Sequence, residues 1–81
     1  MDSKEFFRLM KMVGFTRVEG QDDTTRDCTT FMLVDGEGRA STFAVTTMEL
    51  EECGSELALT AMLLDRHLRQ VDGPRRVTPH V

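Results

Sequence analysis

The hydrophobic pattern along the chain predicts a helix at each end with strands between them. The first helix is expected near the N-terminus, where Asp2 or Ser3 can cap it and Asp2 and Glu5 have the spacing of a capping box. Gly14 stands where a left-handed helix ending is expected, and Phe15 can fold back on the helix from there. Apolar residues recur at helical spacing on the face expected to point inward: Phe6, Leu9, Met10 and Val13, with Phe7 on the flank.

Two strands and a tight turn are expected in the middle of the chain. Residues 28–34 and 39–46 are rich in β-branched and aromatic side chains, which is typical of strands. Residues 35–38, with the sequence Asp-Gly-Glu-Gly, form a strong turn signal between them. A further short strand is expected at residues 15–19, and the polar residues 20–26 are expected to form a mobile loop.

The hydrophobic pattern also predicts the register of the hairpin. A three-residue loop with Gly38 in the left-handed bulge position places Leu33 opposite Ser41 and Phe31 opposite Phe43. Slippage by one residue would send every side chain to the other face, so a buried face should fix the register. The expected buried face carries Phe31, Leu33, Phe43 and Val45.

The last helix, from Ser55 to about Val71, has apolar residues on two nearly opposite sides. One stripe has alternating spacings of four and three, and it is expected to face the sheet: Leu57, Ala61, Leu64, Leu68 and Val71. Leu59 and Leu63, with Met62 beside them, would then be exposed. The alternative is that the helix is rotated, or that the first helix covers this flank, so that these residues are internal.

These elements predict an α+β fold with the order α-β-β-β-α. We expect a three-stranded antiparallel sheet with the N- and C-terminal helices packed on one face. Thr46 and Glu49 have capping-box spacing, so residues 47–53 can add a short acidic helical turn before Gly54. Asp72-Gly73-Pro74 is expected to end the last helix, which makes residues 1–73 one compact domain and residues 74–81 a flexible basic tail.

Composition and charge narrow the classes of function. The chain has 81 residues, a net charge of −4 and five Phe as its only aromatic residues. The acidic balance argues against general nucleic-acid binding. No apolar run is long enough to span a membrane, and the N-terminus lacks the order of a signal peptide, so a cytoplasmic protein is expected. Cys28 and Cys53 are too few for a disulfide scaffold and are expected to be reduced thiols.

No pattern in the chain predicts catalysis or metal binding. His67 is expected on the surface near the end of the last helix, with no nucleophile close to it in sequence, and His80 falls in the tail. Cys28, Cys53 and the two histidines lack the spacing of a metal site. The Asp35–Gly38 turn lacks the ligand series of a calcium loop and the lysine of a phosphate loop. We therefore expect no catalytic residue, metal or cofactor.

The sequence best fits a non-enzymatic protein-interaction module: a regulator, inhibitor or adaptor that occludes a protein partner. A homodimer is expected, and small acidic proteins of this size include bacterial and phage accessory proteins such as inhibitors of host defences, an analogy of size alone. The expected protein-binding residues come from the helix flank that is expected to be exposed and from the neighbouring charges: Leu59, Met62, Leu63, Arg66, Glu49 and Glu52.

The alternative hypothesis is a nucleic-acid-associated regulator that uses the arginine-rich end of the chain. Its contacts would be Arg66, Arg69, Arg75 and Arg76. The basic side chains near a helix end can equally compensate the helix dipole, so the pattern alone leaves both interpretations open. No membrane partner is expected.

Overall fold

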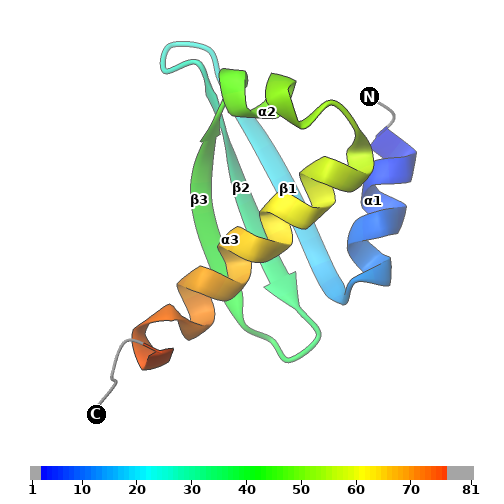
Figure 1. Ribbon diagram of the computed structural model, residues 1–81, viewed down its shortest axis with the longest axis vertical. Helices are drawn as coiled ribbons and strands as arrows, with labels where there is room; N and C mark the ends of the chain where they lie inside the picture. Colours follow the sequence, from blue (N-terminus) through cyan, green and yellow to red (C-terminus); the bar gives the residue numbers. More distant parts are fainter. Residues whose placement is uncertain (1–2, 77–81) are drawn as a thin grey trace.

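The chain folds into a three-stranded antiparallel sheet with helices packed against one face (Figure 1). The computed structural model describes residues 3–76, with side chains for residues 4–72. The elements follow in the order α1 (Ser3–Met12), β1 (Phe15–Asp23), β2 (Cys28–Asp35), β3 (Ala40–Thr46), α2 (Thr47–Cys53) and α3 (Glu56–Arg76). α3 crosses the sheet diagonally and α1 lies beside β1 (Figure 1). The predicted α+β class and strand order are confirmed, with α2 as the short helix between β3 and α3.

The β2–β3 hairpin has the predicted register. Leu33 pairs with Ser41 and Phe31 pairs with Phe43. Gly38 has a φ of 81°, in the left-handed region that the turn requires. Phe31, Leu33 and Val45 are buried on the face that the helices cover, and Phe43 is partly buried beside them.

β1 is longer than the sequence pattern indicates. The prediction of a mobile loop over residues 20–26 is wrong for residues 20–23, which continue β1 and pair with β2. Gly20 lies opposite Phe31, whose ring would approach a side chain at that position to 3.2 Å. Asp22 accepts a hydrogen bond from the Thr29 hydroxyl at 2.8 Å. Pairing with a strong neighbouring strand thus extends β1 through residues with low strand preference.

The helix boundaries follow local capping chemistry, except at the end of α3. The capping box of Thr46 and Glu49 is present, Gly54 ends α2 with a φ of 75°, and Ser55 accepts a hydrogen bond from the Ala58 amide at 3.1 Å. Gly14 is left-handed as predicted. Val13, however, is exposed and does not belong to the inward stripe of α1. The proposed cap at Asp2 lies outside the described residues.

The end of α3 does not follow the local signals. The prediction that Asp72-Gly73-Pro74 ends the helix is wrong, because α3 continues to Arg76. A proline removes only one intrahelical donor, and here it falls close to the helix end, where that loss is small. Residues 74–76 therefore belong to α3, and residues 77–81 of the expected tail lie outside the described residues.

The orientation of α3 is the main correction to the sequence analysis. Leu59 and Leu63, expected on the surface, are 4% and 0% exposed and lie in the core. Leu57 and Leu68, expected inside, are 66% and 37% exposed. α3 is thus rotated about its axis by roughly a third of a turn from the predicted position, and the alternative in which Leu59 and Leu63 are internal is the one that holds. The polar contacts of the buried face explain this choice.

Candidate functional site

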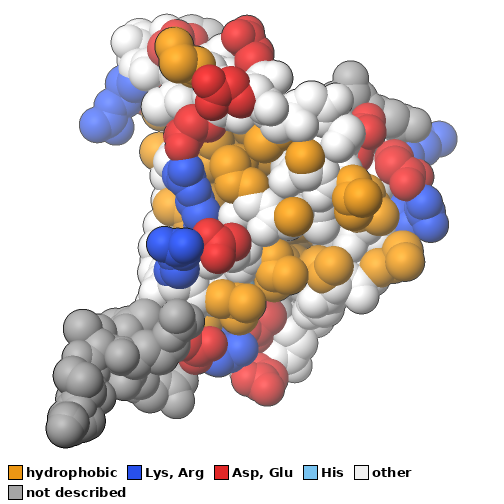
Figure 2. All heavy atoms as spheres, viewed as in Figure 1, with side chains coloured by type: hydrophobic (Ala, Val, Ile, Leu, Met, Phe, Trp, Pro, Cys, Tyr) orange, Lys and Arg blue, Asp and Glu red, His pale blue; other side chains and the backbone are white. Residues whose placement is uncertain are grey.

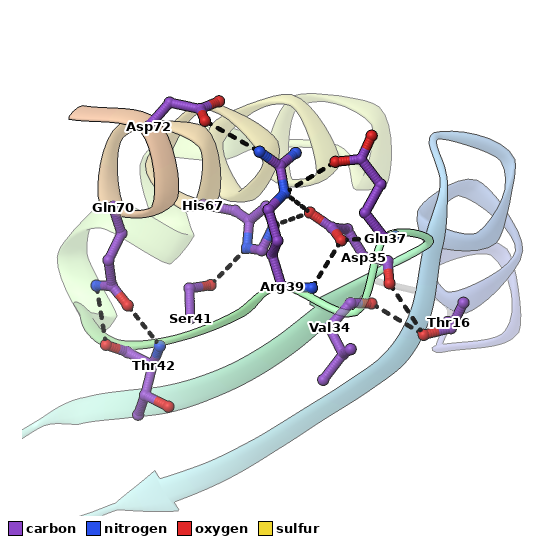
Figure 3. Close-up of polar contacts among 10 residues, drawn as sticks. All are labelled: Thr16, Val34, Asp35, Glu37, Arg39, Ser41, Thr42, His67, Gln70 and Asp72. Atoms are coloured by element: carbon purple, nitrogen blue, oxygen red, sulfur yellow. Dashed lines mark hydrogen bonds and ion pairs between the residues drawn. The ribbon is translucent and has the colours of Figure 1, made fainter. Parts of the chain in front are cut away.

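A buried polar network joins the C-terminal half of α3 to the β2–β3 hairpin (Figure 3). His67 of α3 is fully buried. Its Nδ1 atom lies 2.7 Å from the Ser41 hydroxyl on β3, and its Nε2 atom lies 2.9 Å from Oδ2 of Asp35 at the end of β2. With the neutral imidazole protonated on Nε2, Ser41 donates to Nδ1 and Nε2 donates to the Asp35 carboxylate. Both ring nitrogens are therefore satisfied.

Asp35 is held from several sides. Its Oδ1 accepts the backbone amides of Glu37 and Arg39 at 2.9 and 3.0 Å, and its Oδ2 also accepts Nε of Arg39 at 2.9 Å. These donors, with the hydrogen bond to His67 as the largest cause, hold the pKa of the Asp35 carboxyl far below its usual range. Arg39 reaches on to Asp72 of α3 at 2.9 Å. The hairpin turn and α3 are thus joined through one carboxylate and one guanidinium (Figure 3).

This network has the residue types of a Ser-His-Asp triad but not the accessibility of one. In such triads the serine contacts Nε2 and the aspartate contacts Nδ1, whereas here the two nitrogens exchange partners. Ser41 is only 2% exposed, enclosed between β3 and α3, so its hydroxyl has no path to a substrate. The ring of Phe15 closes the site from β1, with its centroid 4.9 Å from that of His67. The geometry supports a structural tie.

His67 corrects an expectation drawn from the sequence. It was expected on the surface, and it is instead the most deeply buried ionisable side chain among residues 4–72. A signal for this exists in the chain, because His67 continues the four-residue spacing of Leu59 and Leu63 along one helix face. The partners of His67 come from the hairpin, more than twenty residues away in sequence, and no spacing rule connects them.

Gln70 makes a second tie between α3 and the sheet. Its side-chain Oε1 accepts the Thr42 backbone amide at 2.9 Å, and its Nε2 donates to the Thr42 carbonyl at 3.2 Å. The amide group therefore satisfies the middle of the free edge of β3 as a neighbouring strand would (Figure 3). Together, His67 and Gln70 fix both the rotation and the position of α3 along the sheet.

With one face of α3 fixed in the core, the opposite face stays on the surface. This face carries five residues, which we call the α3 stripe: Leu57, Ala61, Leu64, Leu68 and Val71. Leu57, Ala61 and Leu68 are exposed, and Leu64 and Val71 are partly buried. Figure 2 shows hydrophobic side chains gathered over α3 and toward α1, with charged groups around them. The apolar surface that the sequence predicts on α3 exists, on the face opposite to the expected one.

The residues predicted to bind a protein do not form one surface. Leu59 and Leu63 are in the core, and Met62 is partly buried with its sulfur 4.0 Å from that of Cys53. Glu49 and Arg66 form an ion pair that joins α2 to α3. Hydrogen bonds from the Thr46 backbone and from Arg66 lower the pKa of Glu49.

Glu52 is an exposed residue of α2. Of the predicted set, all of it within the described residues, Glu52 is the one that is exposed and forms no ion pair with a neighbouring side chain.

The arginine-rich end is largely paired where its side chains are described. Arg66 contacts Glu49, and Arg69 lies 3.0 Å from Asp65 on the same helix. Arg75 and Arg76 are the last residues of α3, and their side chains lie outside the described part. Nucleic-acid contact by these four arginines stays a prediction, with two of its cations already neutralised by neighbours.

The described residues contain no evident metal site, disulfide or membrane-spanning helix. Among the described residues, no group of three His, Cys, Asp or Glu side chains is placed to hold a metal ion. Cys28 and Cys53 are free thiols, each partly buried. Within residues 3–76, no helix combines the length and apolar character needed to cross a bilayer.

No protein-family model, curated protein or solved structure matches the chain.

Proposed function

We propose that this protein is a non-enzymatic interaction module that binds an amphipathic helix of a partner protein through the α3 stripe. The observation that carries this proposal is the heptad spacing of the stripe, with Leu57, Ala61 and Leu68 exposed, on a helix whose other face already fills the core. A regulator, inhibitor or adaptor acts in this way when it covers a helix that its partner needs for another contact. The buried Ser41–His67–Asp35 network would then serve to present the stripe on a fixed helix.

The spacing of the stripe supports a helical occupant. Its residues alternate by four and three positions, an average of 3.5, which is the repeat with which two helices pack along a seam. Small Ala61 lies between the larger Leu57 and Leu64, so the stripe offers a hollow for a side chain of a facing helix. Asp65 and Arg69 border the stripe with both signs of charge, which can select the partner and its direction.

The energetics favour a reversible complex. Leu57 and Leu68 together expose about as much surface as one whole leucine side chain, and covering it contributes roughly 1.5–3 kcal/mol. A partner helix that buries a similar apolar area doubles this to about 3–6 kcal/mol, which is comparable with the lower range of the association cost of about 4–15 kcal/mol. Contacts beside the stripe must therefore add to the affinity, and the module is suited to a transient partner.

A photo-crosslinking experiment with matched sites tests the proposal. A photoreactive amino acid replaces Leu57 in the cell that makes the protein, and in a second strain it replaces Met48 on α2, which is 68% exposed and outside the stripe. We expect one dominant adduct from position 57 and none of the same mass from position 48. The captured segment is then made as a peptide and mixed with the purified protein.

The peptide experiment decides the mode of binding. We expect the peptide to gain helical circular dichroism on binding, and we expect Leu57→Glu with Leu68→Glu to abolish binding while Met48→Glu leaves it unchanged. Both stripe residues are exposed, so the isolated variants should keep the melting temperature of the parent protein. Equal adducts from positions 57 and 48, or a peptide that binds the stripe variant as well as the parent, would contradict the proposal.

A further inference from the structure

The two edge strands of the sheet differ in whether their outward-facing backbone groups are hydrogen-bonded. β3 forms one edge, and its third residue, Thr42, has its backbone amide and carbonyl bonded to the side chain of Gln70. β1 forms the other edge and is the longest strand of the sheet, with nine residues. A free edge of this length presents unpaired backbone groups that can pair with another strand.

The direction of the free groups on β1 follows from the pairing pattern. Thr42 directs its amide and carbonyl away from β2, and in antiparallel sheets the direction alternates along each strand and is coupled across the pairs. Val18, Gly20 and Asp22 therefore direct their backbone groups toward the open edge. Asp22 is bonded to Thr29 on the helix-covered face, and an inward-pointing charge discourages pairing at that end. The end of β1 around Val18 stays available.

The charges beside Val18 would face opposite charges if a second copy of the same strand paired with this edge. Arg17 and Glu19 flank Val18, lie on the open face of the sheet, and are both exposed. Within one chain they form an ion pair with each other, which a second copy would extend across the junction. In an antiparallel pair of two β1 strands with Val18 on the two-fold axis, Arg17 of each copy stands opposite Glu19 of the other. Registers shifted by two residues lose this match of opposite charges. With Glu19 on the axis, for example, the two Glu19 carboxylates face each other.

Apolar groups lie along the same edge. A groove of about 380 Å³ runs between α1 and the first half of β1, and Phe7, Lys11 and Val18 contribute to its walls. Phe7 is 44% exposed, although its ring packs against that of Phe6 at a centroid distance of 5.3 Å. A strand added at the edge would cover Val18 and bring a second α1 next to Phe7.

We propose that two copies of the chain pair through β1 around Val18 and form a continuous six-stranded antiparallel sheet. The open edge, the self-complementary Arg17 and Glu19, and the exposed apolar groove all lie at this junction, whereas Gln70 closes the opposite edge of the sheet. The pairing leaves the α3 stripe unoccupied on each copy, so the dimer presents two stripes. The inference uses none of the residues of the proposed partner-binding function, and either can hold without the other.

Charge reversal with rescue tests this pairing. Sedimentation equilibrium of the wild-type chain is expected to give twice the 9.2 kDa of one chain at high protein concentration. Arg17→Glu and Glu19→Arg each place like charges opposite one another and should weaken dimerisation at least tenfold. The double variant Arg17→Glu with Glu19→Arg restores opposite charges across the axis and should recover the dimer. As a matched control, Asp65→Arg with Arg69→Asp reverses an exposed pair on α3 and should leave the dimer unchanged.

A measurement on the unaltered chain complements the variants. Amide hydrogen exchange of Val18 should slow as protein concentration rises, whereas exchange in the β2–β3 turn should not change. A wild-type chain that stays monomeric at millimolar concentration would overturn the inference. So would a dimer that both single charge reversals leave intact, and a dimer that Leu57→Glu dissolves would assign self-association to the α3 stripe instead.

Discussion

The rotation of α3 makes a sharp prediction about two leucines of the same helix. Leu63 is completely buried and Leu57 is mostly exposed, and the two lie on opposite faces. Leu63→Ala removes methyl and methylene groups from a closed core and leaves a cavity, so it should lower the free energy of unfolding by about 2–5 kcal/mol. Leu57→Ala removes atoms that already contact water, and alanine and leucine have similar helix propensity, so its effect should stay within about 0.5 kcal/mol.

The expected difference in stability between the two variants is large enough to measure. For a domain of this size, 1 kcal/mol shifts the melting temperature by about 4–8 °C, so Leu63→Ala should melt at least about 6 °C below Leu57→Ala. Urea unfolding of both variants gives the free energies, and an unchanged dependence on urea concentration shows that the unfolded state is not altered. A Leu57→Ala variant as unstable as Leu63→Ala would refute the orientation of α3 and, with it, the exposed stripe.

Other features of the fold give three further predictions. Ser41→Ala leaves Nδ1 of His67 without a partner in the core and should lower the free energy of unfolding by about 1–3 kcal/mol in urea titrations; no loss would mean that the site admits water. Because the pKa of Asp35 is lowered by folding, its ionised form stabilises the protein at neutral pH, and that contribution should fade as the pH drops below about 4, the pKa of an unfolded aspartate. The acid dependence of the melting temperature should be shallower in Asp35→Asn, and parallel curves would speak against this. Gln70→Ala frees the backbone of Thr42, so amide exchange there should accelerate by roughly 5–30-fold for a loss of 1–2 kcal/mol, and unchanged exchange would show that Gln70 does not protect the edge.

Local patterns in the chain predicted the elements whose causes are local. The β2–β3 hairpin, including the opposition of Phe31 and Phe43, follows from alternation and from a glycine at the left-handed turn position. The capping box at Thr46 and the helix ending at Gly54 involve residues within one or two turns of each other. The residues that interact in these features are close together in the sequence, so a short stretch of sequence is enough to predict them.

Elements that depend on distant partners were predicted less well. β1 continues through Gly20 because β2 offers a strand to pair with and Phe31 occupies the space above the glycine. The end of α3 extends past Asp72, whose carboxylate is held by Arg39 of the hairpin. Neither contact has a signal in the local sequence, because both partners come from other elements.

The sequence by itself determined that α3 has two apolar faces and that one protomer can cover only one of them. Only the tertiary structure decided which face is inside. Apolar content alone favours the stripe, which has five apolar residues, so the hydrophobic effect, which has no direction, does not by itself place Leu59 and Leu63 inside. Ser41 and Asp35 on the sheet provide hydrogen-bond partners for the ring nitrogens of His67, and these directional bonds place the face of Leu59 and Leu63 in the core.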